Sequence, residues 1–516
     1  MGPSWTEVRS KFKSPLRVVG WCLWRSMQQR VQKCQRFRQQ RDEARRAVAQ
    51  KEVELARQRE KLCELQDRLR ELEAENRRLT AVPCRLPDDP PLESHKYGLR
   101  MICLAINLAR VVGLRPSERA LKVFWEWLGI EQSLPDWTTI RTWLMRLGVA
   151  ILEEPLEAVD DRVWMVDHSN QIGPEKVLVV LGVRASQLPP PGETLQHKDV
   201  RVLMVQPGTH WKREDMALVY DQLAERCGPP RAVLCDGAVE LREGAANLKN
   251  GHGHTIVVQD FKHKAAIFLK SLLEHCPRFA EFNTAMGKTR SAIQQTEMSY
   301  LTPPSQKPKA RFMNLGPTLE WASAISWLLD HPEAESRRGI AAERLEEKLG
   351  WLRSFAAELV TWHECQQVVN AGLRFINEQG LSRGAAERLR AILDVTAKNA
   401  VSQQLADRLV GFVAATEAEL QVGERLPMST EILESTFALY KQLEGQHSKG
   451  GFTALLAGFA ALLKPATEKS VRRAFSKVSV KRVREWAKTN LGTTLTSKRQ
   501  ALYTEFRSAT EITTAI

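Results

Sequence analysis

The stretch VWMVDHSNQIGPEKVLVVLGV, residues 163–183, decides the fold of this protein. Two apolar runs flank a polar turn, and a single carboxylate, Asp167, follows the first run. Short runs of β-branched and aromatic residues that are bounded by turn residues are typical of strands. The pattern therefore predicts two neighbouring strands with an acid at the end of the first. It raises the question of which other acids lie beside Asp167.

Strand and helix patterns continue to alternate downstream of this stretch. Short apolar runs predict five strands in total, and an amphipathic pattern predicts a helix between the third and the fourth. The order of three strands, a helix and a further strand resembles that of the ribonuclease H-like fold. The predicted strands are RVWMV (162–166), KVLVVLGV (176–183), VRVLMVQ (200–206), RAVLC (231–235) and HTIVVQ (254–259), and the helix covers residues 212–227.

Acidic residues follow three of these strands. Asp167 follows the first strand, Asp236 follows the fourth in LCDGA, and Asp260 follows the fifth. The first and fourth strands are central neighbours in the ribonuclease H-like fold, so the resemblance implies that Asp167 and Asp236 lie close together. Neighbouring carboxylates repel each other unless a cation lies between them, and Mg²⁺ prefers oxygen ligands. Two such ions can support an in-line phosphoryl transfer.

A third acid is expected from a later helix, and Glu434 in STEILESTFALYK is the candidate. Lys441 lies seven residues later, two helical turns away on the same face. Together with the two aspartates, this pattern resembles the DDE transposases of bacterial insertion sequences. The resemblance implies Mg²⁺-dependent phosphodiester hydrolysis and strand transfer at element ends, with Mn²⁺ as an expected substitute. It also implies that Asp167, Asp236 and Glu434 are catalytic metal ligands, and that Lys441 contacts the DNA backbone.

Two alternatives stay open at the carboxylates. Asp260 is either a fourth metal ligand or the cap of the helix that follows it. Glu431 competes with Glu434 for the third position, although it has no Lys seven residues later. The long spacing between Asp236 and Glu434 predicts a helical insertion, residues 276–428, before the final acid.

The N-terminal region is basic and has a heptad pattern. Residues 1–46 hold 12 Lys and Arg against three acids, and the whole chain carries a net charge of +14, which favours a polyanion as partner. A seam of leucines continues over residues 55–79, with Asn76 at one seam position. A lone Asn in such a seam fixes register and dimer state, so the pattern predicts a coiled-coil homodimer. A solitary amphipathic helix is the alternative.

Residues 95–152 predict a helix-turn-helix DNA-binding domain after the Pro-rich linker 82–94. Three helices are expected, at about 96–111, 117–128 and 137–147. The third has Asp136 or Thr138 as its cap and mixes Thr, Arg and Trp. A three-helix pack without DNA contacts is the alternative. Candidate DNA contacts are Thr138, Thr139, Arg141 and Arg146 in this domain, and Lys307, Lys309 and Arg311 in a basic patch of the insertion.

The chain as a whole predicts a multidomain protein, with all-α N-terminal parts and an α/β core that an all-α insertion interrupts. Nine scattered cysteines without a C-x-x-C motif favour a reducing cytosol, and no apolar run is long enough for a membrane span. We expect a cytoplasmic protein that joins the bacterial nucleoid by binding double-stranded DNA. The predicted segments are 1–81 (basic arm and coiled coil), 82–94 (linker), 95–152 (helix-turn-helix), 160–275 (ribonuclease H-like core), 276–428 (helical insertion), 429–465 (final core helix) and 466–516 (basic C-terminal helices).

Two other functions fit the same residues. One is a catalytically silent DNA-binding protein that derives from a transposase, and the other is a structure-specific nuclease of the same fold. A dimerising coiled coil beside a helix-turn-helix favours recognition of specific DNA ends, and therefore favours the transposase.

Overall fold

The computed structural model describes residues 15–81, 88–170, 176–208, 211–305, 312, 315–332, 340–445, 454–491 and 500–507. The chain divides into two compact units, Met1–Asp88 and Asp89–Ile516. It is mostly helical, and a mixed five-stranded sheet lies in the second unit.

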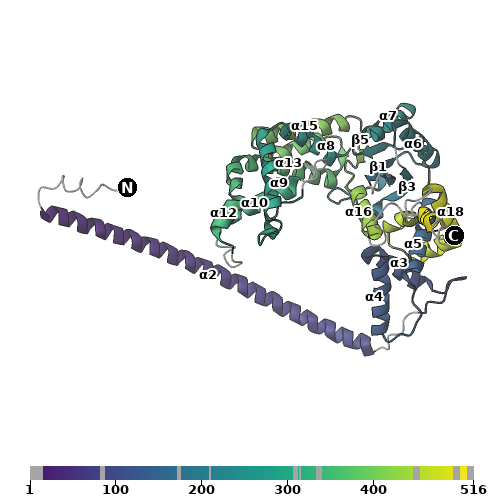
Figure 1. Cartoon of the computed structure of the whole chain (residues 1–516), viewed down its shortest axis with the longest axis horizontal. Coiled ribbons are helices and arrows are strands. Elements are labelled where there is room, and N and C mark those ends of the chain that lie inside the picture. The colour runs from purple at the N-terminus through teal and green to yellow at the C-terminus, as the bar shows by residue number, and fades with distance from the viewer. Residues whose placement is uncertain are drawn as a thin grey trace, which may run out of the picture. The chain divides into compact units, whose positions relative to one another are not determined.

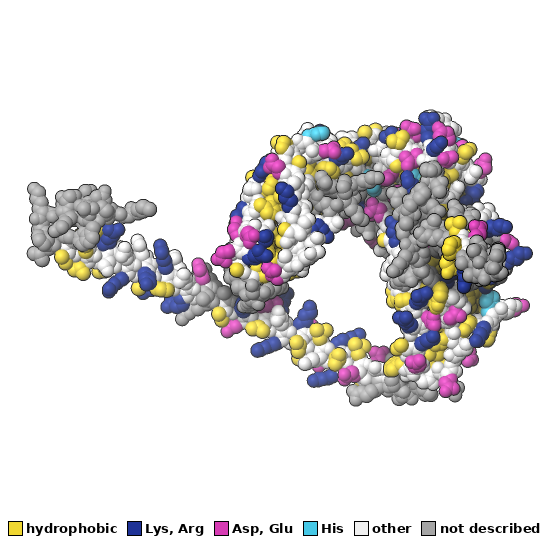
Figure 2. Space-filling model, in the orientation of Figure 1, with side chains coloured by type: hydrophobic (Ala, Val, Ile, Leu, Met, Phe, Trp, Pro, Cys, Tyr) yellow, Lys and Arg dark blue, Asp and Glu magenta, His cyan; other side chains and the backbone are white. Residues whose placement is uncertain are grey.

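The first unit is built on one long helix, α2 (Pro15–Ala81). Its seam residues Leu55, Leu62 and Leu69 expose between 50% and 58% of their surface, and Figure 2 shows hydrophobic and basic side chains on the described parts of the helix. The helical heptad region agrees with the sequence, while pairing with a second chain stays a prediction. Within the described ranges, no helix combines the length and the apolar character that a bilayer crossing needs.

A mixed sheet forms the centre of the second unit, with the strand order β3-β2-β1-β4-β5 (Figure 1). The pairs β1–β2 and β2–β3 are antiparallel, whereas β1, β4 and β5 run parallel. The first and fourth strands are therefore neighbours, and the sheet is consistent with a ribonuclease H-like core. The five strands are β1 (Arg162–Asn170), β2 (Lys176–Arg184), β3 (Arg201–Gly208), β4 (Ala232–Cys235) and β5 (Ile256–Gln259).

Alternate residues of β1 face two different hydrophobic clusters. Val163 and Met165 belong to the larger cluster, whereas Trp164 and Val166 belong to the smaller one. All four side chains are fully buried, so both faces of the sheet are covered. This explains the continuous apolar runs in the sequence, because a strand that is buried on both faces shows no polar alternation.

Two helices cover the face of the smaller cluster. They are α6 (Arg213–Cys227) and α7 (Val239–Gly251), and both contribute buried side chains to that cluster. The helix α6 confirms the predicted one, whereas α7 has no counterpart in the prediction. Its buried residues Leu241, Ala245 and Leu248 recur at helical spacing, which is the signal that could have identified it.

A helical insertion occupies the chain between β5 and α16 (Glu431–Gly445). A buried ion pair fastens its end to the sheet, because Arg231 beside β4 donates to Glu424 at 2.8 Å. The same guanidinium also donates to the carbonyl of His254, before β5. The elements of the insertion are α8 (Phe261–Leu273), α9 (Pro277–Ile293), α10 (Leu315–Asp330), α12 (Ala342–Leu349), α13 (Ala356–Gln379), β6 (Leu381–Ser382), α14 (Ala385–Thr396), α15 (Ala400–Glu417) and β7 (Arg425–Leu426).

Three helices also occur close to the positions predicted for the helix-turn-helix. They are α3 (Leu99–Val112), α4 (Leu114–Trp127) and α5 (Trp137–Leu152). Asp136, one of the two predicted caps, begins α5 by accepting the backbone N–H of Thr139 at 2.8 Å. The local prediction of three helices is therefore confirmed.

The prediction for α5 is wrong at Arg146, because this part of the helix is buried. All residues from 143 to 149 are buried, and α5 packs against η6 (Ala454–Leu462), α17 (Glu468–Lys477) and α18 (Val480–Leu491). At Gly148, an added Cβ would overlap the carbonyl oxygen of Ala457 in η6. The C-terminal segment thus covers the part of α5 that contains Arg146, whereas Thr138 in the first turn stays exposed.

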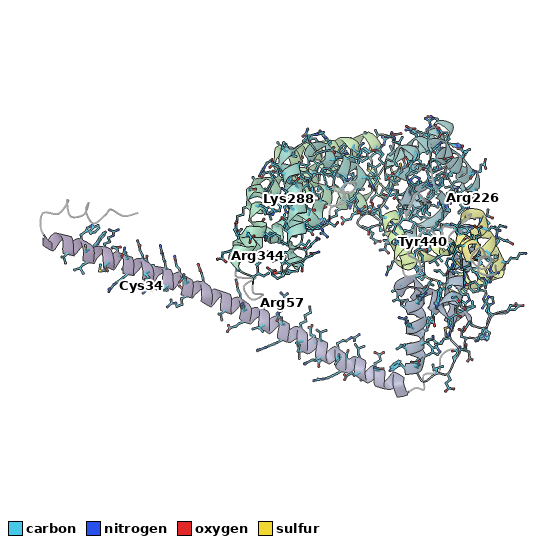
Figure 3. All side chains as sticks on the ribbon, in the orientation of Figure 1. Cys34, Arg57, Arg226, Lys288, Arg344 and Tyr440 are labelled. Atoms are coloured by element: carbon cyan, nitrogen blue, oxygen red, sulfur yellow. The ribbon has the colours of Figure 1, made fainter. Side chains whose placement is uncertain are left out.

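The contacts of Arg146 contradict the DNA contact that was predicted for this residue. Its guanidinium donates to the carbonyls of Val478 and Phe475 at 2.7 and 2.9 Å, and it stacks on the Phe475 ring at 3.9 Å. The predicted DNA contact at Arg146 is therefore wrong, since the end of α17 already takes its donors. Arg226 of α6 (Figure 3) adds a link to this region by donating to the carbonyl of Leu152.

The substitution Gly148→Ala tests the packing of α5 on η6. The new methyl group would overlap backbone atoms, so we expect the free energy of unfolding to fall by about 1 to 3 kcal/mol. Gly287→Ala in α9 is the control, because an added Cβ there meets nothing within 4 Å. It should be neutral or stabilise by up to about 1 kcal/mol. Urea denaturation measures both, and equal effects would contradict the packing.

Candidate functional site

Acidic residues stand in a row at the carboxyl edge of the parallel strands. Val166 of β1 pairs with Cys235 of β4. Asp167 and Asp236 directly follow these two residues in the sequence. Neighbouring strands lie about 4.8 Å apart, so the two aspartates begin close together. Asp260 follows the last residue of β5, which pairs with β4.

Asp167 lies in surroundings that disfavour its ionised form. Burial and the negative charge of Asp236 raise the pKa of Asp167 to about 7, and the charge of Glu434 adds to this shift. The backbone N–H of His168, which donates to Asp167 at 2.6 Å, only partly opposes it. Acids from β1, β4 and α16 therefore act on one another, and a cation among them would relieve the repulsion.

Asp236 occupies a tight turn between β4 and α7. Its carboxylate accepts the backbone N–H of Ala238 at 2.8 Å. Gly237 has a φ of +93°, a conformation that residues with a Cβ rarely adopt. Glycine therefore allows the chain to turn directly after Asp236, which explains the Asp-Gly-Ala sequence.

Asp260 caps α8 and also holds the start of α16. One carboxylate oxygen accepts the His263 backbone N–H at 2.7 Å, and the other accepts the Thr430 backbone N–H at 2.7 Å and its hydroxyl at 3.0 Å. Burial acts to raise the pKa of Asp260, but these hydrogen bonds and His263 lower it. Both oxygens are engaged, which favours the helix cap over the alternative of a metal ligand.

Glu434 lies in the first turn of α16, the helix that begins directly after Thr430. Lys262 of α8 lies 2.9 Å from Glu434 and 3.5 Å from Glu431. Burial disfavours the charged ammonium, but the two glutamates outweigh it and raise the pKa of Lys262. The third acid thus comes to the same region as the aspartates, with an ammonium group as its direct partner.

His263 also belongs to this region. Its position three residues after Asp260 favours a helix surface, with contact to a phosphate or a metal ion as the alternative interpretation. Its Nδ1 lies 2.8 Å from Asp260. Burial lowers the pKa of His263, but the hydrogen bond with Asp260 and the charges of Asp236 and Glu434 outweigh it and raise the pKa. The available signal was the spacing of Asp260 and His263 at a helix start, because residues i and i+3 share a face.

The donor chemistry of the site fits a divalent cation. Asp167 and Asp236 offer oxygen ligands whose mutual repulsion a cation would relieve. Across the described ranges, however, no three His, Cys, Asp or Glu side chains are grouped so that they could hold an ion. Glu434 is instead paired with Lys262 of α8.

The remaining predicted DNA contacts are dispersed. Lys441 is exposed on α16, with its ammonium 6.0 Å from the Phe437 ring. Thr138 is exposed in the first turn of α5, whereas Thr139 and Arg141 are half-buried. DNA contacts at these four positions stay predictions. Lys307, Lys309 and Arg311 lie outside the described residues.

Comparisons with solved structures give distant matches. No family model matches the sequence, and no curated protein matches it. A solved structure described as the Drosophila P element transposase strand transfer complex is 12% identical, with a TM-score of 0.36, and the match covers 78% of this chain and 97% of that chain.

The substitution Asp167→Asn should stabilise the protein in metal-free buffer at high pH. The pKa of Asp167 is about 7 in the folded chain and about 3.9 in an unfolded one. Folding stability therefore falls as the pH rises from about 4 to 7, and the whole penalty is present above 7. We expect a gain of about 1 to 3 kcal/mol at pH 8 in EDTA and a smaller gain near pH 5, measured by urea denaturation.

Asp161→Asn is the matched control, with the opposite sign. Asp161 accepts from the Arg184 guanidinium at 2.9 Å and from the Ser186 hydroxyl. Although burial acts against it, these contacts lower the pKa of Asp161. Its contribution to stability is therefore present above the unfolded pKa, and the Asn variant should be less stable at pH 8. A gain from Asp167→Asn that does not change with pH would contradict the explanation by charge.

Proposed function

We propose that this chain is a DNA transposase that hydrolyses and joins phosphodiester bonds with Mg²⁺. The observation that supports this proposal is that Asp167 and Asp236 follow paired residues of β1 and β4, and that the charges of Asp236 and Glu434 add to burial in raising the pKa of Asp167. Mg²⁺ at these carboxylates would activate the nucleophile and stabilise the departing oxygen.

The chain's own residues would divide the remaining tasks. Asp167 and Asp236 come from the rigid centre of the sheet and would fix the position of the reaction. His263, whose pKa is raised, would donate a charge-assisted hydrogen bond to a phosphate oxygen. Lys441, two helical turns beyond Glu434, would contact the DNA backbone. Hydrolysis would free a 3′-hydroxyl, which would then attack the target strand.

The C-terminal helices α17 and α18 would offer a basic surface to a DNA partner, in addition to the first turn of α5. Arg472 of α17 and Lys481 and Arg484 of α18 are exposed and form no ion pair among the described residues. The opposite faces of these helices, with Phe475 and Trp486, are buried. Lys and Arg side chains are visible at the edge where α18 lies (Figure 2). Positive charge of this kind gives salt-dependent affinity for phosphates.

The helix α2 would bring two protomers together. Its leucine seam is exposed along one chain, and a second copy of the same seam would bury it in a coiled coil. Two catalytic units would then hold two DNA ends in one complex. This pairing is the homodimer that the heptad pattern predicts.

Mg²⁺-dependent nicking of DNA tests the proposed activity. The full-length protein should cleave a duplex made from the sequences that flank its gene, and EDTA should abolish the cleavage. Asp236→Asn should reduce the rate at least about 100-fold, because a metal ligand is lost, and should leave DNA binding intact. Asp221→Asn, an exposed acid of α6, is the control and should cleave at the wild-type rate.

The two rival functions give different results in the same assay. A catalytically silent DNA-binding protein would bind the duplex and cleave nothing under any metal condition. A structure-specific nuclease would cleave branched or hybrid substrates in preference to duplexes that contain the flanking sequences. Undiminished cleavage by Asp236→Asn would show that the acids are assigned wrongly.

The salt dependence of DNA binding tests the basic surface. Replacing Arg472, Lys481 and Arg484 with Gln should reduce the slope of log K against log salt by about 2 to 3, since each phosphate contact contributes about 0.9. The effect should be the same for flanking and unrelated duplexes. The control replaces three exposed cations of the insertion with Gln, namely Lys288 (Figure 3), Arg374 and Lys398. Equal slopes for the two triple variants would contradict the assignment.

A further inference from the structure

Lys262 is a cation in direct contact with the proposed third ligand. It lies in the first turn of α8, and its ammonium is 2.9 Å from Glu434 and 3.5 Å from Glu431. The Lys262 side chain is 26% exposed. An ion pair that is partly shielded from water is stronger than one on an open surface, so this contact has a real influence on the position of Glu434.

The backbone fixes this contact from both helices. Asp260 caps α8 and accepts two hydrogen bonds from Thr430, the residue directly before α16. The starts of α8 and α16 are therefore held together. Glu431 and Glu434 lie three positions apart on α16, so they share one face. A single ammonium from α8 can consequently reach both carboxylates.

The contact with Lys262 competes with the function proposed for Glu434. A carboxylate that is paired with an ammonium has to exchange this partner before it can bind a metal ion. In the part of the chain that the structure describes, Glu434 acts on Asp167 through its charge, yet no group of three acidic, His or Cys side chains is arranged to hold an ion. The aspartates are in place, and the third acid is retained by α8.

We propose that Lys262 is a positioning residue that holds Glu434 back from Asp167 and Asp236 until the metal site is loaded, an inference that rests on the proposed function. Glu434 then exchanges the ammonium for the ion, while Lys262 keeps Glu431 as its partner. The second glutamate matters because a half-buried ammonium without any partner would be costly. Loading therefore moves one carboxylate and leaves no cation unpaired.

A purely structural ion pair would behave differently when Lys262 is replaced. If Lys262 only stabilises the fold, its loss lowers the stability and leaves the affinity for Mg²⁺ unchanged. If it holds Glu434 back, its loss lowers the stability of the metal-free protein and raises the affinity for Mg²⁺. The affinity rises because a competing partner and a repelling positive charge both disappear. Stability and affinity therefore change in opposite directions.

The test compares full-length wild-type protein with Lys262→Gln in Mg²⁺ titrations without DNA. Thermal unfolding in EDTA gives the metal-free stability, and the rise in melting temperature with Mg²⁺ gives the apparent dissociation constant. We expect a lower melting temperature in EDTA and an affinity for Mg²⁺ that is about 3- to 10-fold higher. Lys262→Arg keeps the charge and should stay close to the wild type in both measurements.

Lys264→Gln is the matched control on the same helix. Lys264 lies two residues later, and its ammonium is 5.4 Å from the Phe268 ring and donates to the Gln259 side chain at 3.3 Å. Its loss should leave the affinity for Mg²⁺ unchanged. If Mg²⁺ stabilises the wild type and Lys262→Gln binds it no more tightly, the positioning role is overturned. If Mg²⁺ does not stabilise even the wild type, the metal site of the proposed function fails, and the inference fails with it.

Discussion

One buried contact, between Asp260 and Thr430, fixes the geometry on which the site depends. Thr430 donates its backbone N–H and its hydroxyl to the carboxylate, and the neighbouring Phe261 N–H donates to the Met428 carbonyl at 2.9 Å. The helical insertion therefore leaves and rejoins the sheet at one point, and its length does not move Glu434. Hydrogen bonds to a charged group contribute about 1.5 to 3 kcal/mol each to stability, so the two bonds from Thr430 can hold the start of α16 beside the start of α8.

The sheet and its first two acids could be predicted because their signals are local. Apolar runs mark the strands, and the ends of the runs mark Asp167 and Asp236. Asp260 stands at an equivalent strand end, yet its function differs because of a partner that is 170 positions away. Lys262 and His263 likewise acquire their functions from the return of α16. No local pattern encodes these contacts, so the sequence alone left the alternatives for Asp260 open.

The helix α5 also shows that a local sequence pattern does not reveal which distant segment packs against it. Its capped start and helical period were correctly predicted, but an amphipathic pattern indicates only that a face is buried and not what covers it. Arg146 resembled a DNA contact by residue type, whereas its acceptors Phe475 and Val478 lie more than 300 positions later. The small residue Gly148 was the local hint, because a close backbone approach often requires a glycine.

The fold reduces the repulsion at the carboxyl edge without removing it. Lys262 supplies positive charge, and His263 does so when it is protonated. Burial lowers the pKa of both groups, but the acids that face them outweigh it and raise both pKa values. More positive charge would leave nothing to attract a divalent ion, whereas less would leave like charges crowded together at a cost to stability. Burial is the largest cause of the raised pKa of Asp167, and the negative charges of Asp236 and Glu434 add to it, so repulsion among the acids remains. The carboxylates of this region are Asp167, Asp236, Asp260, Glu431 and Glu434.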